Sequence, residues 1–233
     1  MECEHSAASH DGTLVSAASA PEGSRAWLLI EHAGPWPAEA AEAALPAALR
    51  SVVNQAVEHG VRVQMIRRPG HRGQLRGRAV FAGWTAGSAP WLRRLDVPAD
   101  LDVVALSRGE HSGSGQPAAE AMYLVCGHAQ RNACCARFGG PLAQELAARY
   151  PRQTWQTTHV GGHRFAANLV ILPHGLYYGP VGLAEAMTAI GAYERGDVVA
   201  ERYRGRAGQP HDVQEAEHDR LAAARSLPFA ALT

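Results

Sequence analysis

Two cysteines and two histidines fall at spacings that suit a metal centre. Eight residues separate Cys126 from Cys135, and the segment His159-Val-Gly-Gly-His163 follows after a gap of 23 residues. Thiolate sulfur and imidazole nitrogen are the ligands of zinc sites and of mixed-ligand iron–sulfur clusters. The two glycines disfavour a helix, so we predict a tight loop that lets both imidazoles converge on one centre.

Two metal assignments compete for this ligand set. Zinc would take two sulfurs and two nitrogens in a tetrahedron, but zinc-binding cysteines are typically about two to four residues apart. A 2Fe–2S cluster contains two irons, so its ligand pairs can be spread further. Two cysteines on one iron and two histidines on the other is a known division of ligands.

The pattern Cys126, eight residues, Cys135 and then His159-x-Gly-Gly-His163 resembles the signature of the sucrase/ferredoxin-like family. The stretch 27–36, with its Gly-Pro-Trp turn, is also similar to bacterial members. The resemblance implies a C-terminal thioredoxin-like ferredoxin domain and a divergent N-terminal domain. It further implies a 2Fe–2S cluster, with Cys126 and Cys135 on one iron and His159 and His163 on the other.

The ligand types predict an intermediate-to-high reduction potential. Two neutral imidazoles in place of two thiolates remove negative charge, which makes the addition of an electron easier. Clusters of this kind reach about −150 mV or above, against about −400 mV for plant-type ferredoxins. We therefore expect His159 and His163 to hold the more exposed, reducible iron.

Each of four residues near these ligands has two possible roles. Cys134 is either a ligand in place of Cys135 or a small core residue. His128 is either a hydrogen-bonding neighbour of the site or an exposed loop residue. Arg131 and Arg164 either stabilise negative charge at the site or are ordinary surface arginines.

Alternating strand and helix patterns surround these residues and must position them. Apolar runs flanked by turn residues predict strands, and apolar residues three or four apart predict helices. The predicted strands are 27–31, 61–65, 79–84, 101–106, 122–126, 154–158 and a hairpin at 168–178. The predicted helices are 46–60, 135–149, 183–193 and 213–225.

This order predicts an α/β protein with three parts. A loose arm covers residues 1–24, an N-terminal α/β accessory domain 25–115, and a thioredoxin-like ferredoxin domain 116–233. The boundary falls in the polar, Gly- and Ser-rich segment 109–117. The first half has a strand and helix order similar to that of the second, so a second thioredoxin-like domain is the alternative for it.

Composition excludes several classes of function. The 233 residues include 22 basic and 22 acidic residues, and all the basic ones are arginines, so the formal charge is zero. A neutral chain lacks the positive excess for non-specific nucleic-acid binding. We see no apolar stretch long enough to span a membrane and no secretory signal. Four cysteines are too few for a disulfide scaffold, which favours the reducing cytoplasm.

One charge feature stands out from the neutral average. No acidic residue lies between Glu58 and Asp96, and that window contains several arginines. It is either a docking surface for an acidic redox partner or a solvated hairpin and loop. The arginines considered are Arg62, Arg67, Arg68, Arg72, Arg76 and Arg78.

These observations predict a one-electron carrier whose donor and acceptor proteins the sequence does not name. We assign no catalytic residue and expect no sucrose cleavage, because no convincing pair of carboxylates suits glycoside hydrolysis. One rival function is a thiol–disulfide or peroxide-type oxidoreductase that uses Cys126 with Cys134 or Cys135, although it lacks a Cys-x-x-Cys motif. The other rival is a structural zinc-binding module.

Overall fold

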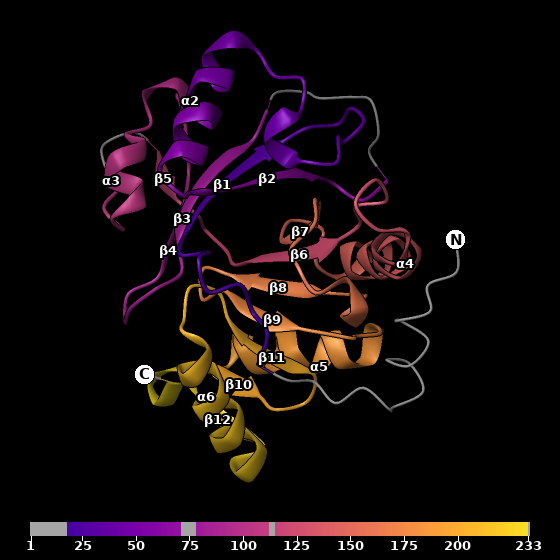
Figure 1. Ribbon diagram of the computed structural model, residues 1–233. Helices are drawn as coiled ribbons and strands as arrows, with labels where there is room; N and C mark the ends of the chain where they lie inside the picture. Colours follow the sequence, from indigo (N-terminus) through magenta and orange to yellow (C-terminus); the bar gives the residue numbers. More distant parts are fainter. Residues whose placement is uncertain (1–17, 71–77, 112–114, 233) are drawn as a thin grey trace.

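A computed structural model describes residues 18–70, 78–111 and 115–232 (Figure 1). The first half of the chain begins with two parallel strands connected through a helix, and continues with an antiparallel pair and a short helix. Its elements are β1 (Ala26–Glu31), α2 (Ala47–Glu58), β2 (Arg62–Arg67), β3 (Val80–Trp84), β4 (Trp91–Arg94), α3 (Val103–Ser107) and β5 (Gln116–Pro117), with 3-10 turns η1 (Ala40–Glu42) and η2 (Pro98–Asp100).

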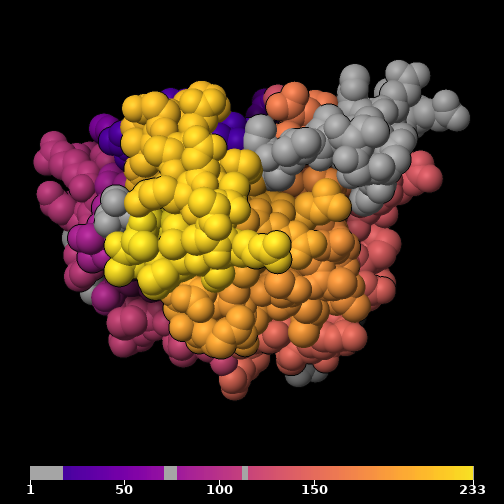
Figure 2. All heavy atoms as spheres, turned by 90° about the horizontal axis from the view of Figure 1, so that it is seen from below, coloured from indigo at the N-terminus to yellow at the C-terminus, as the bar shows by residue number. Residues whose placement is uncertain are grey.

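The second half repeats this order and then extends it. The repeated elements are β6 (Met122–Cys126), α4 (Ala133–Arg149), β7 (Thr154–Thr157), β8 (Leu169–Leu172), β9 (Leu176–Tyr178) and α5 (Leu183–Glu194). The extension contains β10 (Asp197–Val199), β11 (Tyr203–Arg206), α6 (His211–Ala224) and β12 (Ser226–Pro228), and 3-10 turns occur at η3 (His163–Phe165) and η4 (Phe229–Leu232). Figure 2 shows the C-terminal segment, in yellow, lying across the orange part of this half.

The two halves share one pattern of strand pairing. In the first half, β1 pairs in parallel with β2 and antiparallel with β3, which pairs with β4. In the second half, β6 pairs in parallel with β7 and antiparallel with β8, which pairs with β9. The strand order β2-β1-β3-β4 is therefore repeated as β7-β6-β8-β9.

One antiparallel contact joins the halves into a single ten-stranded sheet. Ile66 of β2 lies opposite Thr157 of β7, and Arg67 lies opposite Gln156. The resulting strand order is β11-β9-β8-β6-β7-β2-β1-β3-β4-β5. Because β2 and β7 run in opposite directions and pair through their last residues, the start of β2 lies beside the segment that follows β7.

The sheet folds back so that the surfaces of both halves that lack helices pack together. Figure 1 shows α2 and α3 on the outside of the first half and α5 on the outside of the second. Between the halves lies one apolar core that contains Trp27 and Leu29 from the first half and Leu124 and Trp155 from the second. Each half also has its own core under its helices.

Most of the predicted elements are confirmed, with one error and several omissions. The helix predicted at 46–60 is α2, and the one at 135–149 is α4. The strand predicted at 101–106 is wrong: this segment forms the helix α3, whose start is capped because Asp102 accepts a hydrogen bond from the Ala105 amide at 2.9 Å. The strand β4 and the small sheet of β10 and β12 were not predicted from the sequence.

The described end of the predicted arm is held in place. Residues 1–17 lie outside the described residues, but the amides of Ser19 and Ala20 donate to the carbonyl of Arg204. The side chain of Gln214 exchanges two further hydrogen bonds with Ala20. The mixed α/β class is confirmed, while the domain division at residue 115 stays a prediction, since one sheet runs through both halves.

No helix in the described ranges is both long and apolar enough to cross a membrane.

Candidate metal centre

Three of the four predicted ligands converge. Cys126 ends β6, Cys135 lies in the first turn of α4, and His159 follows β7. One ligand atom from each lies within 4.8 Å of the other two. The Nδ1 atom of His159 is 3.9 Å from the Cys126 sulfur and 3.7 Å from the Cys135 sulfur.

The strand pairing explains this convergence. Because β6 and β7 are parallel neighbours, their carboxyl ends meet at one edge of the sheet, with Cys126 opposite Thr157. The helix α4 begins seven positions beyond Cys126, at Ala133, and Asn132 caps it by accepting a hydrogen bond from the Cys134 amide at 2.9 Å. The short connection therefore returns the first turn of α4 to the strand end.

A glycine allows α4 to lie directly against β6. A Cβ atom at Gly139 would be 1.9 Å from the carbonyl oxygen of Cys126, far inside van der Waals contact. Gly140, the next residue, has nothing within 4 Å of the equivalent position. The close approach of helix and strand, and with it the Cys126–Cys135 contact, thus depends on one of two adjacent glycines.

The two thiols are free, buried and electrostatically unequal. The hydrogen bond from Cys135 is the main cause that lowers the pKa of Cys126 well below its usual value, with smaller contributions from His159 and the His128 amide, against the effect of burial. The same hydrogen bond and burial raise the pKa of Cys135. A metal binds both sulfurs as thiolates, so metal binding releases any proton that the pair still holds.

The first half of the chain holds the backbone of His159 in place. The His159 carbonyl accepts hydrogen bonds from the side chains of Arg62 and Gln64, each at 3.2 Å. Gln64 in turn accepts hydrogen bonds from the hydroxyls of Thr157 at 3.1 Å and Thr158 at 2.5 Å. The histidine therefore sits on a loop fixed by the β2–β7 junction, which sequence patterns do not reveal.

His128 fixes the same loop from the other side. It is 1% exposed, so the alternative of an exposed loop residue is wrong. Its Nδ1 accepts a hydrogen bond from the His159 amide at 3.2 Å, which leaves Nε2 to donate to the Pro37 carbonyl at 2.8 Å. Its ring also packs edge-on against Trp36, with centroids 6.0 Å apart. His128 therefore links the His159 loop to the first half of the chain.

His163 lies beside the three converging residues but is not part of their group. It begins η3, is exposed, and its ring centroid is 6.2 Å from that of His159. The tight loop predicted between the two histidines is confirmed, because Gly161 and Gly162 have φ angles of 98° and 65°. Only glycine adopts such angles readily, so the loop depends on this pair.

The other neighbouring residues stay outside the group. Cys134 is disulfide-bonded, so it does not replace Cys135 as a free thiol. Arg131 forms an exposed ion pair with Glu39 at 2.6 Å. Arg164 is exposed and its guanidinium lies 4.7 Å from the ring centroid of Phe165. Both arginines therefore match the surface alternative.

A cavity of about 310 Å³ opens beside His159. Its walls come from both halves and include His128 and Thr158 on one side and Arg62, Gln64 and Glu39 on the other. The candidate centre is therefore approached through the junction between the halves.

The acid-free arginine window has a structural use that sequence analysis did not anticipate. The guanidinium of Arg67 lies 3.7 Å from the ring centroid of Trp36 and donates to Gln156 at 3.2 Å. Arg68 lies 3.6 Å from the Trp155 ring centroid. The contacts with Gln156 and Trp155 link the halves, while Arg72 and Arg76 lie outside the described residues.

Two buried thiols and an imidazole, converging on a mixed α/β scaffold, define a candidate metal-binding protein. The chain belongs to the sucrase/ferredoxin-like family, whose pattern matches residues 18–205. The resemblance drawn from the cysteine and histidine spacing is thereby confirmed at the level of the family.

Two curated relatives are both called altered inheritance of mitochondria protein 32. The one from Meyerozyma guilliermondii is 29% identical over 101 residues, which cover 39% of this chain and 36% of the relative. The one from Eremothecium gossypii is 32% identical over 106 residues, covering 39% and 34%. The match thus spans about a third of the relatives' length. No solved structure matches the chain.

Proposed function

We propose that this protein carries single electrons through a 2Fe–2S cluster bound by Cys126, Cys135, His159 and His163. The observation that carries the proposal is the convergence of two free, buried thiols with the His159 imidazole. Membership of a family described as ferredoxin-like supports the same chemistry. When bound, such a cluster supplies a site that accepts and releases one electron.

The donor set fits this group in chemistry and in layout. Two thiolates suit one iron and two imidazoles suit the other. The cysteines are fully buried, whereas His159 is half-buried and His163 is exposed. The histidine side of the site is therefore the side that a partner protein can approach. His163 lies close enough to His159 to complete the set with a rearrangement of its own side chain.

The surrounding residues would orient the ligands. Arg62 and Gln64 hold the His159 carbonyl, and His128 holds its amide, so the imidazole is fixed from both sides of its backbone. Such supporting hydrogen bonds affect metal affinity, typically by about 10- to 100-fold. The cavity beside His159 gives a partner access to this side of the site.

The strand order supports a thioredoxin-like description of the ferredoxin half. In that arrangement a β-α-β unit is followed by an antiparallel hairpin and a helix, which is the order of β6, α4, β7, β8, β9 and α5. The first half has the same order, so we extend the proposal to a thioredoxin-like accessory half.

One observation favours a structural zinc site as the second candidate. Three donor atoms within 4.8 Å of one another are close enough to share a single ion, with His163 as a fourth ligand. The thiol–disulfide alternative is less supported, because Cys126 and Cys135 are both 0% exposed and an attacking thiolate must reach its substrate.

We also propose that the protein works in a reducing compartment such as the cytoplasm. Metal binding requires Cys126 and Cys135 to stay reduced, and both are free thiols, whereas the disulfide of Cys134 would be open in such a compartment.

Exchange of the histidines tests their role as ligands. His159→Cys and His163→Cys each add a thiolate charge, so we expect a cluster to persist with a lower reduction potential in protein film voltammetry. His59→Cys, at an exposed position at the end of α2, is the control and leaves the potential unchanged. Unaltered spectra and potentials in both ligand variants would show that these histidines are not ligands.

A further inference from the structure

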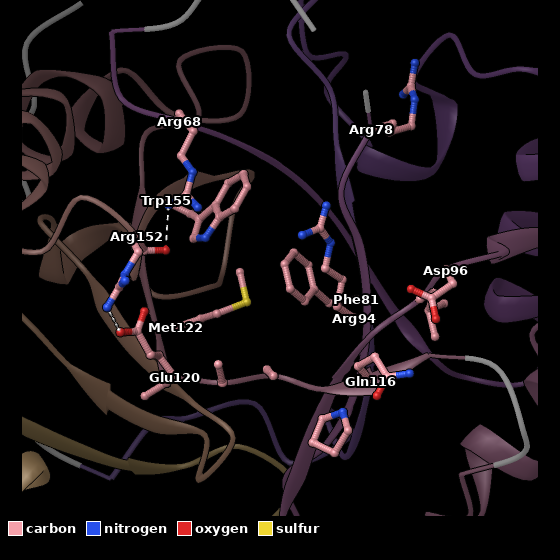
Figure 3. A pocket seen from close by; sticks show the side chains of 15 residues that line it. Arg68, Arg78, Phe81, Arg94, Asp96, Gln116, Glu120, Met122, Arg152 and Trp155 are labelled. Atoms are coloured by element: carbon pink, nitrogen blue, oxygen red, sulfur yellow. Dashed lines mark hydrogen bonds and ion pairs between the residues drawn. The ribbon is translucent and has the colours of Figure 1, made fainter. Parts of the chain in front are cut away.

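A second cavity, of about 620 Å³, lies at the other end of the core between the halves (Figure 3). Met122, which lines it, begins β6, whereas Cys126 ends the same strand. Four residues of strand correspond to about 13 Å. The cavity shares no residue with the candidate metal centre, so an inference about it stands apart from the proposed function.

Positive charge dominates the lining. Four arginines face two acidic residues, which leaves a formal charge of +2. One of the acids, Glu120, is paired with Arg152 at 2.5 Å. The other, Asp96, is exposed, and Figure 3 shows it at the edge of the group on the side away from Trp155. Asp96 is therefore the one lining acid left to balance the three positive charges of Arg68, Arg78 and Arg94.

Two of these arginines are held in place by other contacts. Arg68 stacks on Trp155 and donates to the carbonyls of Pro151, Arg152 and Thr154 at 2.8–3.1 Å. Arg78 donates to the Glu31 carbonyl at 3.1 Å. Guanidinium groups fixed in this way lose little side-chain freedom when they bind a ligand.

Arg94 is the remaining donor. It is exposed, and in the described part of the chain its guanidinium makes no hydrogen bond or ion pair. Figure 3 shows it directed into the space between Trp155 and Arg78. Burial lowers the pKa of Arg68, the negative charge of Glu31 raises it, and the positive charge of Arg94 lowers it again, so Arg94 and Arg68 repel each other across the cavity. An anion between them removes this repulsion.

The floor of the cavity is apolar and aromatic. Phe81 and Trp155 meet edge to face with ring centroids 6.0 Å apart, and Met122 lies beside them. All three belong to the core between the halves, so the floor is part of a packed interior and not a mobile surface. The volume falls within the range of about 300–1,000 Å³ found for small-molecule sites.

We propose that this cavity binds a small phosphate ester with an aromatic body. A phosphate monoester carries nearly two negative charges at neutral pH, which matches the surplus of +2. Its oxygens suit the paired N–H groups of Arg94 and its neighbours. The aromatic body packs against the parts of Phe81 and Trp155 that line the cavity, beside the Arg68 guanidinium that already stacks on Trp155.

Calorimetric titration with AMP as the probe tests the proposal on the full-length protein. We expect saturable binding of AMP with a dissociation constant below about 1 mM. Adenosine, which lacks the charge, and inorganic phosphate, which lacks the ring, should each bind at least about tenfold more weakly. Arg94→Ala removes the donor without a structural contact and should weaken AMP binding at least about tenfold. Arg108→Ala, at an exposed arginine outside the lining, should leave it unchanged.

Three results would overturn the proposal. The first is the absence of AMP saturation at about 10 mM. The second is equal binding of AMP and either control compound, since the charge or the ring then contributes nothing. The third is unchanged binding in Arg94→Ala. The metal content of every variant is measured alongside and should not change, which separates failure of this cavity from failure of the proposed metal centre.

Discussion

The two halves of this chain have the same strand order but end their first strands differently. In the second half β6 ends in Cys126, and six residues separate it from α4, which returns Cys135 to the strand end. In the first half β1 ends in Glu31, and 15 residues separate it from α2. No cysteine lies between residues 18 and 125, so the equivalent edge of the first half has no thiol to offer a metal.

The longer connection of the first half instead covers the site of the second. Its Pro37 carbonyl and Trp36 ring contact His128, and its Glu39 pairs with Arg131. The β2–β7 junction adds the hydrogen bonds of Arg62 and Gln64 to His159. The two halves thus have the same topology but different roles: the second half carries the candidate ligands, and the first half supports the loop that contains His159.

The largest effect is expected from replacing the cysteines that distinguish the second half from the first: loss of the metal centre. Cys126→Ser or Cys135→Ser makes the second half resemble the first, which lacks thiol ligands. We expect bound iron to fall more than about tenfold, because removing a ligand costs more than removing a supporting hydrogen bond. Elemental analysis and the visible spectrum measure the loss.

Cys134→Ser is the matched control, because Cys134 is adjacent to Cys135 but outside the converging group; it is compared with the unchanged protein under reducing conditions, in which the disulfide of Cys134 is open in both. It should retain the metal. Metal loss in Cys134→Ser and retention in Cys135→Ser would reverse the assignment of the ligand within the cysteine doublet.

The next effect comes from the contact between α4 and β6. Gly139→Ala places a methyl group 1.9 Å from the Cys126 carbonyl, so the helix must move away from the strand. We expect the free energy of unfolding, measured in urea, to fall by about 3 kcal/mol and the metal content to be reduced.

Gly140→Ala tests the same helix at a position with open space. Alanine favours the helix there and should raise the unfolding free energy by about 0.5–1 kcal/mol. Equal responses of the two variants would contradict the close packing of α4 on Cys126.

A smaller effect is expected from the support that the first half gives. Gln64→Ala leaves the hydroxyls of Thr157 and Thr158 and the His159 carbonyl short of a buried partner. We expect a loss of about 1–2 kcal/mol in unfolding free energy and weaker metal retention against a chelator. Gln55→Ala, on the exposed side of α2, should change neither quantity. If metal retention is the same in both variants, the first half does not support the centre.

An effect on stability alone, and not on the metal, is expected from the C-terminal extension, which the first half lacks. His174 stacks on Phe229 with ring centroids 4.4 Å apart, and burial, followed by the charge of Arg206, lowers its pKa from 6.5 to about 4. The unfolded chain therefore binds the proton more readily than the folded one. The stabilisation by neutral His174 is complete above about pH 6.5 and declines as the pH falls toward 4.

Urea unfolding between pH 7 and 4 measures this dependence. His174→Phe keeps an aromatic ring beside Phe229 and should flatten the decline, whereas His59→Gln, at an exposed position, should not. An unchanged slope in His174→Phe would remove His174 as its cause.

The sequence was most informative where local patterns decide the structure. The strand before Cys126, the helix after it and the glycine loop between the histidines follow from short segments, and their parallel connection brings Cys126, Cys135 and His159 together. The segment 101–106 shows the limit of such patterns, because its apolar run suits a strand and its Asp102 cap made it a helix.

Contacts between distant segments could not be predicted from the sequence. The antiparallel pairing of β2 with β7 joins residues about 90 positions apart and shows no periodicity of its own. The roles of Gln64, Arg62 and His128 depend on that pairing and on the long connection of the first half. The arginine window was visible, but its contacts with Trp36 and Trp155 and its share in the second cavity depend on the folded sheet.

The most direct test of the central claim is the metal and sulfide content of the protein after purification without oxygen. We expect a brown protein with about two iron and two acid-labile sulfide per chain, and the visible absorption spectrum of a 2Fe–2S cluster. A colourless protein that holds a single zinc ion, or one that holds no metal, would contradict it.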